Sequence, residues 1–345
     1  MSRVVEHLAN LTGFRDRDVL DVTLVGALKD VLRPLSVAIY RCVGDDGAQR
    51  WLTRAHLLAG DSAATADPLW AEPDTLPLLT DHPDRHRCLL RQEAFAVEGP
   101  PALSYFPLAT DHLPIGVVEI QTPQALSSEE VRLVSSILRL YRNYQGLLDY
   151  SERDTLTGLL NRKTFDENFL RQAAQPLALA AHQVGHGGIR RYGTHGSLWL
   201  GVLDIDHFKR VNDNFGHLIG DEVLLLLSRL MRSTFRFQDH LYRFGGEEFL
   251  VLMRCNDPGD VSKAFERLRG NVAAYAFPQV GRITVSVGFT EVRTSDSPSA
   301  AFERADKAIY HAKQNGRNQV CHRAELVAAG KLADTARDNN DAELF

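Results

Sequence analysis

The sequence predicts two α/β or α+β domains joined by a long helix. Its 345 residues are too many for one ordinary hydrophobic core, so two cores are expected. A capping-box motif opens a long apolar-periodic segment, and a turn containing Gly158 ends it. The predicted divisions are an N-terminal domain at 1–126, a linking helix at 127–152, a second domain at 153–322 and a polar C-terminal tail at 323–345.

Composition excludes several broad classes of protein. A hydrophobic content of 44% and a charged content of 24% are ordinary for a globular chain and exclude a mainly disordered or fibrous one. The net charge of −5 supplies no basic field for a nucleic acid, so local cations would hold any nucleotide ligand. No apolar run reaches the roughly 20 residues of a membrane helix, and the N-terminus lacks a signal-peptide pattern. We therefore expect a cytoplasmic protein without a membrane span.

The N-terminal domain is expected to place a helix before a sheet. Apolar residues recur at helical spacing from Val19 to Leu32, and the segment 36–43 has the pattern of a strand. The segments 102–108 and 115–121 flank a polar turn and predict a hairpin. This order resembles that of a GAF domain, and a PAS-like fold is the alternative. The resemblance implies a sensor whose ligand or protein partner is unknown.

The linking helix begins with a strong local pattern. Ser127 and Glu130 form the capping box, in which each side chain bonds the other residue's backbone N–H. Apolar residues then follow heptad spacing, with Gln145 at one polar position of the stripe. The residues of this stripe are Val131, Val134, Leu138, Tyr141, Gln145 and Leu148. We expect two copies to pair along it as a short parallel coiled coil; the alternative is packing on the helix's own domain.

The first acidic element of the second domain follows a buried strand. The run 198–203 is apolar at consecutive positions, which is typical of a central strand covered on both faces. It leads directly into Asp204 and Asp206. A carboxylate buried there needs a cation or hydrogen-bond donors close by, which favours a divalent metal over an ordinary strand-end turn.

The second acidic element is a tight turn. Two short strands, 241–244 and 249–253, are joined through Gly245-Gly246, a pair that is typical of a hairpin turn. Glu247 and Glu248 follow the glycines directly. Because glycine has no side chain and tolerates positive φ, a polyphosphate could approach this backbone while the acids bind metal or accept a proton.

One stretch between these elements and the linking helix is compositionally distinct. Residues 183–196 are rich in glycine and include His186 and His195, which predicts a flexible surface loop. The two histidines lack the local spacing of a known ligand pair, so we do not expect a metal site there.

Several motifs of the second domain occur in a fixed order. They are Asp154-x-Leu-Thr-Gly-Leu-x-Asn-Arg162, the run from Asp204 to His217, Gly220-Asp221-Glu222, the turn at 245–249 and the segment 310–318. Together they resemble the GGDEF family over residues 150 to 322. The resemblance implies a palm-like antiparallel sheet with a ferredoxin-like core, flanked by helices. It also implies a diguanylate cyclase, which condenses two GTP into cyclic di-GMP with loss of two pyrophosphates.

The same resemblance implies roles for individual residues. Asp204, the backbone carbonyl of Ile205 and Glu247 would hold two Mg²⁺ or Mn²⁺ ions per active site, and Glu248 would assist deprotonation of the 3′-hydroxyl. The implied substrate contacts are Phe208, Lys209, Lys313 and Arg317 for the phosphates, with Lys313 and Arg317 one helical turn apart, and Asn212 and Asp221 for guanine. Without the register of the motifs, these residues would also suit turns, helix ends or solvated surfaces.

Regulation and assembly follow from the resemblance as well. Arg236, Asp239 and Arg267 match a site at which cyclic di-GMP, the product, acts as an inhibitor. Since each catalytic domain would hold one GTP, the reaction implies a homodimer whose geometry the N-terminal domain controls. The alternatives are a non-catalytic receptor for cyclic di-GMP and a GTP-binding module that drives a partner phosphodiesterase.

Overall fold

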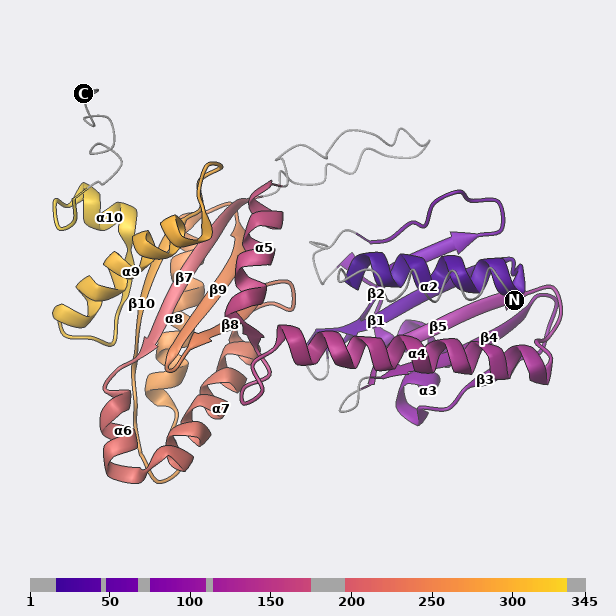
Figure 1. Ribbon diagram of the computed structural model, residues 1–345, viewed down its shortest axis with the longest axis horizontal. Coiled ribbons are helices and arrows are strands. Elements are labelled where there is room, and N and C mark those ends of the chain that lie inside the picture. The colour runs from indigo at the N-terminus through magenta and orange to yellow at the C-terminus, as the bar shows by residue number, and fades with distance from the viewer. Residues whose placement is uncertain (1–16, 45–47, 68–74, 110–113, 175–195, 334–345) are drawn as a thin grey trace. The chain divides into compact units, whose positions relative to one another are not determined.

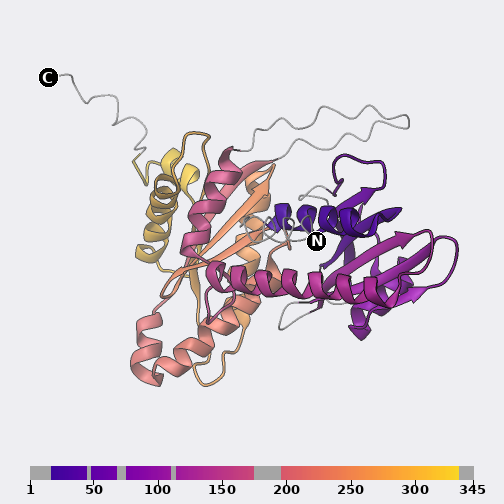
Figure 2. The ribbon, with the colours of Figure 1, turned by 45° about the vertical axis from the view of Figure 1, so that its right-hand side comes forward.

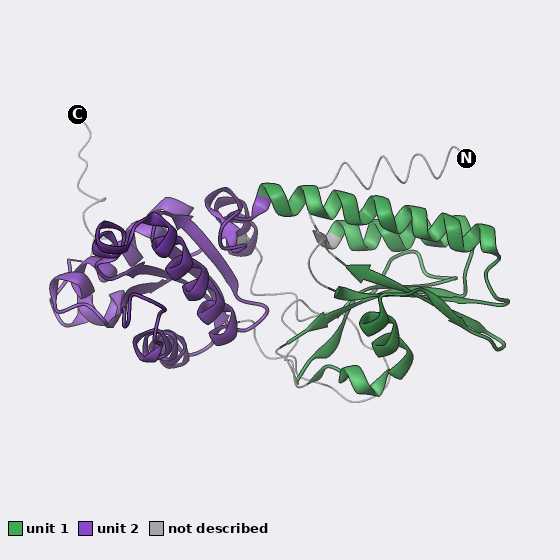
Figure 3. Ribbon diagram, turned by 90° about the horizontal axis from the view of Figure 1, so that it is seen from below, with its two compact units in different colours: residues 1–151 green, residues 152–345 purple. Residues whose placement is uncertain are grey.

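The computed structural model describes residues 17–44, 48–67, 75–109, 114–174 and 196–333, shown as coloured ribbons in Figures 1 and 2. The chain divides into two compact units, residues 1–151 and 152–345 (Figure 3). Apart from Gly196, the predicted loop at 183–196 lies outside the described residues. Within the described ranges, no helix has the length and apolar character needed to cross a bilayer.

The N-terminal unit is built on a five-stranded sheet in the order β2-β1-β5-β4-β3. All neighbouring strands are antiparallel, which confirms the predicted strand at 36–43 and the predicted hairpin. The strands are β1 (Ser36–Val43), β2 (Arg50–Leu58), β3 (Phe95–Val97), β4 (Ala102–Ala109) and β5 (Pro114–Thr122).

Helices cover both faces of this sheet. The helices are α2 (Arg17–Leu32), η2 (Leu79–Asp81), α3 (Pro83–Arg91) and α4 (Ser128–Glu152). Apolar residues of α2 and α4 share one core with the sheet, and those of η2 and α3 share another on the opposite face (Figure 3). The predicted capping box of α4 is confirmed, because the Ser127 N–H donates to Glu130 Oε2 at 2.8 Å and the Glu130 N–H donates to Ser127 Oγ at 3.3 Å.

The stripe of α4 that was expected to pair with a second copy packs inside its own unit instead. Its buried apolar members are Val134, Leu138, Tyr141 and Leu148. Gln145, the polar member, donates to the Tyr141 hydroxyl at 2.8 Å, and this hydroxyl in turn lies against Asp21 of α2. The coiled-coil prediction for this stripe is therefore wrong. The apolar face of the sheet needs α4 as its cover, and burial there leaves the stripe unavailable to another chain.

The C-terminal unit contains a six-stranded sheet in the order β11-β10-β7-β9-β8-β6. The four central strands are antiparallel, whereas β11 and β6 add to the edges as parallel strands, so the sheet is mixed. The central order and its two helical crossovers match a ferredoxin-like arrangement. The strands are β6 (Leu160–Asn161), β7 (Ser197–Ile205), β8 (His240–Gly245), β9 (Glu248–Cys255), β10 (Val285–Glu291) and β11 (Val320–His322).

Helices flank this sheet on both sides as well. They are α5 (Arg162–Ala174), α6 (Phe208–Phe215), α7 (His217–Thr234), α8 (Pro258–Ala274), α9 (Pro298–Gln314) and α10 (Arg323–Ala328). Residues of α6, α7 and α8 pack on one face, and residues of α5 and α9 on the other. Strand β7 is buried at every position after Ser197, as the apolar run predicts. The predicted polar tail is wrong in its first part, because Leu326 of α10 packs against Ala308 and Ala312 of α9.

Helix α9 lies unusually close to the sheet. A Cβ atom built on Gly288 of β10 would come within 2.3 Å of Ala305 O and Ile309 N, both backbone atoms of α9. Only glycine at this position permits the approach. Since α9 carries Lys313 in its last turn, this contact sets where that cation lies relative to the sheet.

We expect Gly288→Ala to lower the free energy of unfolding by about 3 kcal/mol, because neither backbone segment can yield to the added methyl group. Gly270→Ala in α8 is the matched control, since a Cβ there meets no atom within 4 Å. It should raise stability by roughly 0.5–1 kcal/mol through better helix propensity. Calorimetry of the two variants tests the pair, and equal unfolding temperatures would contradict the close-packing argument.

Candidate active site

Strand register brings the two acidic elements together. Asp204, the last residue but one of β7, pairs across the sheet with Glu248 of β9 on one side and Ser286 of β10 on the other. Asp204 is only 7% exposed, whereas Glu248 is half-buried at the first position of its strand. The sheet thus places two carboxylates from segments far apart in sequence at neighbouring positions of one edge.

The acidic turn differs slightly from its predicted form. Gly245 pairs with Glu248, so the two loop residues between β8 and β9 are Gly246 and Glu247. Only Gly246 has positive φ, at 53°, which is the pattern of a type II′ turn. A Cβ on either glycine would meet nothing within 4 Å, so there is open space beside the turn.

An arginine that no sequence motif indicated holds this turn in place. Arg243 Nε donates to the Gly246 carbonyl at 3.0 Å, and Arg243 Nη1 bonds both carboxylate oxygens of Asp154 at 3.1 and 3.2 Å. Asp154 also accepts from the N–H and the hydroxyl of Thr157, which lowers the pKa of its carboxyl. The motif that runs from Asp154 to Arg162 therefore supports the acidic turn through Asp154. No local pattern indicated Arg243, because its partner lies 89 residues earlier in the chain.

Positive charge offsets the carboxylates at this edge only in part. Burial raises the pKa of Asp204, and Lys313 opposes that rise with its Nζ 2.8 Å from Asp204 Oδ2. Burial and then repulsion by Asp204 raise the pKa of both Glu247 and Glu248. Asp306 of α9 adds further negative charge near Glu248. Lys313 thus lies at the acids and not apart from them, so the expected metal and phosphate regions are contiguous.

The acids fit a metal that is shared with a substrate. Across the part of the chain that the structure describes, no three His, Cys, Asp or Glu side chains gather into a metal cage. Mg²⁺ is usually held by one or two protein carboxylates together with substrate phosphates and water. Asp204 and Glu247 can supply two carboxylates, and their raised pKa values are those of acids that need a cation. Ile205, whose carbonyl was the third expected ligand, ends β7 directly after Asp204.

The expected phosphate contacts lie at two helix ends. Phe208 and Lys209 begin α6 immediately beyond β7; Phe208 is buried and Lys209 is exposed. Lys313 lies in the last turn of α9. The expectation that Arg317 lies one helical turn further along the same helix is wrong, because Gly316, with φ at 107°, ends α9 in a left-handed turn.

The two expected guanine contacts share one corner of the unit. Asn212 lies on α6 and Asp221 on α7. A Cβ on Gly220 would come 2.0 Å from Asn212 Oδ1, so the Asn212 amide lies against the start of α7, next to Asp221. Asp221 is exposed and lies inside α7, which begins at His217, so it is not a helix N-cap.

The expected inhibitory residues also come together. Asp239 Oδ2 accepts the Arg236 backbone N–H at 2.9 Å, which makes this segment a turn and not a helix-surface ion pair. Arg267 of α8 donates to the Thr234 carbonyl at 2.7 Å, close to that turn. Burial raises the pKa of Asp239 to about 6, against the opposing charges of Arg236 and Arg267.

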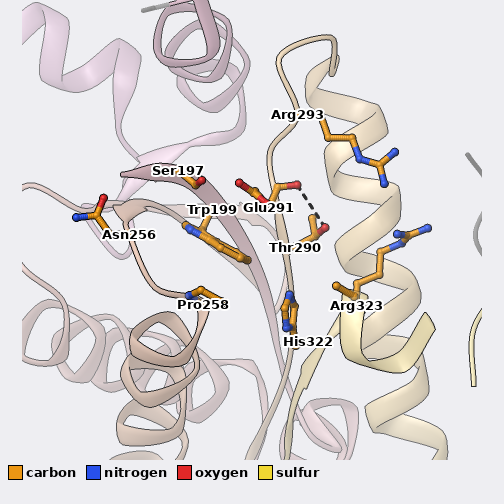
Figure 4. A pocket seen from close by; sticks show the side chains of 10 residues that line it. Ser197, Trp199, Asn256, Pro258, Thr290, Glu291, Arg293, His322 and Arg323 are labelled. Atoms are coloured by element: carbon orange, nitrogen blue, oxygen red, sulfur yellow. Dashed lines mark hydrogen bonds between the residues drawn. The ribbon is translucent and has the colours of Figure 1, made fainter. Parts of the chain in front are cut away.

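A cavity of about 370 Å³ lies elsewhere in the unit (Figure 4). It opens near Ser197, the first residue of β7, which is about 23 Å along the strand from Asp204. None of the expected site residues lines it. The candidate site is therefore a polar edge of the sheet and not this cavity. The cavity is lined by Ser197, Trp199, Asn256, Pro258, Thr290, Glu291, Arg293, His322, Arg323 and Ala324.

The C-terminal unit is similar in sequence to known proteins. Residues 151–319 match the family of the diguanylate cyclase GGDEF domain. Diguanylate cyclase DgcP of Pseudomonas aeruginosa is 41% identical over 170 residues, which cover 48% of this chain and 23% of DgcP. The response regulator PleD of Caulobacter vibrioides is 33% identical over 228 residues, covering 61% of this chain and 46% of PleD. A crystal structure of the coiled coil and GGDEF domain of DgcB from Caulobacter crescentus with c-di-GMP is 31% identical, with a TM-score of 0.45, covering 57% of this chain and 100% of that one.

The chain spans less than half the length of either DgcP or PleD. The family match begins at the end of α4 and stops just before β11. It includes both acidic elements, the α6–α7 corner and the turn that follows α9. Residues 151–319 therefore form a GGDEF domain of the diguanylate cyclase family.

Proposed function

We propose that this chain is a diguanylate cyclase that condenses two GTP molecules into cyclic di-GMP and releases two pyrophosphates. The observation that carries the proposal is the edge at which Asp204, Glu247 and Glu248 meet Lys313. Acidic residues there suit a metal-bound triphosphate, and basic residues beside them suit its terminal phosphates. The curated relatives DgcP, DgcM and DgcZ carry the same activity in their names.

Each residue of the edge has a proposed task. Asp204, Glu247 and the Ile205 carbonyl would hold two Mg²⁺ or Mn²⁺ ions, which when bound would acidify the 3′-hydroxyl and neutralise the triphosphate. Glu248 would accept the hydroxyl proton; the burial that raises its pKa makes it a stronger base than an exposed glutamate. Lys313 and Arg317, with Lys209 and the Phe208 backbone, would bind the phosphates.

Base selection is assigned to the α6–α7 corner. Asp221 can accept hydrogen bonds from the guanine N1 and N2 donors, and the Asn212 amide lies next to it. Adenine lacks that donor pair, so ATP would leave the Asp221 carboxylate without hydrogen-bond donors from the base.

We also propose a homodimer, because one protomer holds one GTP and cannot close the ring alone. Its seam would be the exposed stripe of α4 that contains Leu140 and Leu147, which lie seven residues apart. Leu140 is 49% exposed and Leu147 is 67% exposed, and a spacing of seven residues places both on the same side of the helix. A second copy of the same helix would bury both by heptad packing.

The N-terminal unit is proposed as a GAF-like sensor. Its antiparallel sheet with helices on both faces supports this assignment. Helix α4 covers that sheet and leads within two residues to Asp154, which supports the acidic turn through Arg243. An unidentified ligand or protein that shifts α4 would thereby change the geometry of the catalytic domains.

Product inhibition is proposed at Arg236, Asp239 and Arg267. A guanine offers O6 and N7 as acceptors to the arginines and N1 and N2 as donors to Asp239. The proximity of all three residues around one turn supports this assignment.

Replacing Glu248 by glutamine should lower cyclic di-GMP formation by at least about 100-fold, because the isosteric amide cannot accept the proton. Binding of GTP and thermal unfolding should stay unchanged. The measurement is chromatography of products after incubation with GTP and Mg²⁺. Glu325→Gln, at an exposed position of α10, is the control and should match the wild type. Full activity in Glu248→Gln would contradict the assignment of Glu248 as the proton acceptor. A wild-type protein that binds cyclic di-GMP but forms none from GTP would instead be a receptor.

The double variant Leu140→Glu/Leu147→Glu should be monomeric and nearly inactive at low protein concentration, because buried glutamates would destabilise the helix pair. Activity should recover in part when the protein is concentrated. Sedimentation velocity alongside the activity assay tests this. Ser135→Glu, an exposed position of α4 outside the stripe, should remain dimeric and active. A dimer that persists in the double variant would place the interface elsewhere.

Inhibition by cyclic di-GMP should weaken as pH falls through about 6, the pKa of Asp239. Below that pH the carboxyl is protonated and loses acceptor capacity, so the inhibition constant should be about tenfold higher at pH 5 than at pH 7.5. Asp239→Asn should be inhibited weakly at both pH values. Inhibitor titrations at the two pH values provide the measurement, and an identical inhibition constant in the wild type at both would argue against Asp239 as a contact.

A further inference from the structure

The turn that carries Arg317 has a conformation that side chains rarely adopt. Gly316, Arg317 and Asn318 all have positive φ, at 107°, 62° and 44°. Glycine adopts such angles freely, whereas arginine and asparagine adopt them at a conformational cost. Two consecutive residues of this kind persist only where the surrounding structure holds them, and such turns cluster at functional sites.

Hydrogen bonds from three sides hold this turn. The Arg317 N–H donates to Ala312 O at 3.0 Å and closes the end of α9. The Asn318 N–H donates to Asp206 Oδ2 at 3.0 Å, and Asn318 Oδ1 accepts from Arg269 Nη1 of α8, also at 3.0 Å. The turn is therefore attached to the end of β7 through Asp206 and to α8 through Arg269.

Asp206 is the central member of this arrangement. It is 5% exposed and lies two residues beyond Asp204. Besides the Asn318 N–H, its carboxylate accepts the hydroxyls of Thr284 at 2.6 Å and Ser286 at 2.7 Å. All three donors are uncharged, so the carboxylate acts here as a hydrogen-bond acceptor and not as one half of an ion pair. It joins the end of β7, the start of β10 and the turn after α9.

We propose that Asp206 is a positioning residue for Arg317, a role that rests on the proposed function. A guanidinium on a loop reaches the terminal phosphates productively only if the loop's backbone is fixed to within a fraction of an ångström. Asp206 fixes the loop to the same strand end that carries Asp204. One buried carboxylate thereby ties the backbone beside Arg317 to the strand end that carries the acidic edge.

Three variants separate the effect of the Asp206 hydrogen bonds from the effect of its negative charge. Asp206→Ala removes all three hydrogen bonds, and Asp206→Asn removes the charge but keeps an acceptor for the Asn318 N–H. Ser286→Ala removes one bond to the carboxylate without touching the turn. We expect the KM for GTP to rise about tenfold in Asp206→Ala and less than about threefold in the other two, as one lost charge-assisted hydrogen bond would give. Equal losses in Asp206→Asn and Asp206→Ala would overturn the inference in favour of a role for the charge.

Binding without turnover gives the second readout. A non-hydrolysable GTP analogue and GMP, titrated calorimetrically, report on the terminal phosphates and on the base separately. Asp206→Ala and Arg317→Ala should each weaken the analogue about tenfold and leave GMP unchanged. If Asp206 acts through Arg317, the double variant should be no weaker than Arg317→Ala alone.

The results of these titrations distinguish a failure of the positioning role of Asp206 from a failure of the proposed cyclase function. Additive losses in the double variant, while the wild type binds the analogue, would overturn the inference alone. A wild type that binds neither ligand would overturn the proposed function and the inference with it. Should Asp206→Ala fail to fold, Arg269→Ala loosens the same turn from a partly exposed position. It should then weaken the analogue about threefold and spare GMP, and unchanged affinity would overturn the inference.

Discussion

Like charge gathered at one edge of the C-terminal sheet is the constraint on which the rest of the candidate site depends. Antiparallel pairing sets Asp204 opposite Glu248, and the two-residue loop adds Glu247 beside them. Burial and mutual repulsion raise the pKa of all three carboxyls. Such a cluster needs positive charge nearby. Lys313 supplies one ammonium group, and the proposed metal ions would supply the remainder only when a nucleotide is present.

The surrounding contacts hold this edge and its cations in register. Arg243 ties the acidic turn to Asp154, and Asp206 ties the end of β7 to the turn that carries Arg317. Gly288 allows α9 to approach the sheet closely enough to place Lys313 beside Asp204. Each contact joins segments that are distant in sequence. The geometry of the edge is therefore a property of the whole unit.

Helix α4 shows how two demands compete for one amphipathic segment. Its heptad stripe covers the apolar face of the N-terminal sheet, because that face has no other cover of comparable length besides α2 within the described residues. Leu140 and Leu147 lie outside that stripe and remain exposed, so they are accessible to a second chain. Sensor and dimer seam would thus occupy two sides of the same helix, so that repacking on one side can alter pairing on the other.

Local sequence patterns predict several elements of the fold: the capping box of α4, the buried strand that leads into Asp204, the Gly-Gly turn and each of the short motifs that resemble the GGDEF family. These are readable because each depends on neighbours a few residues away. The folded structure was needed to show which stripe of α4 is buried, that Arg243 pairs with Asp154, that Lys313 bonds Asp204 and that Arg317 lies beyond the end of the helix. Those outcomes depend on strand register and helix packing, which bring together residues that no local pattern connects.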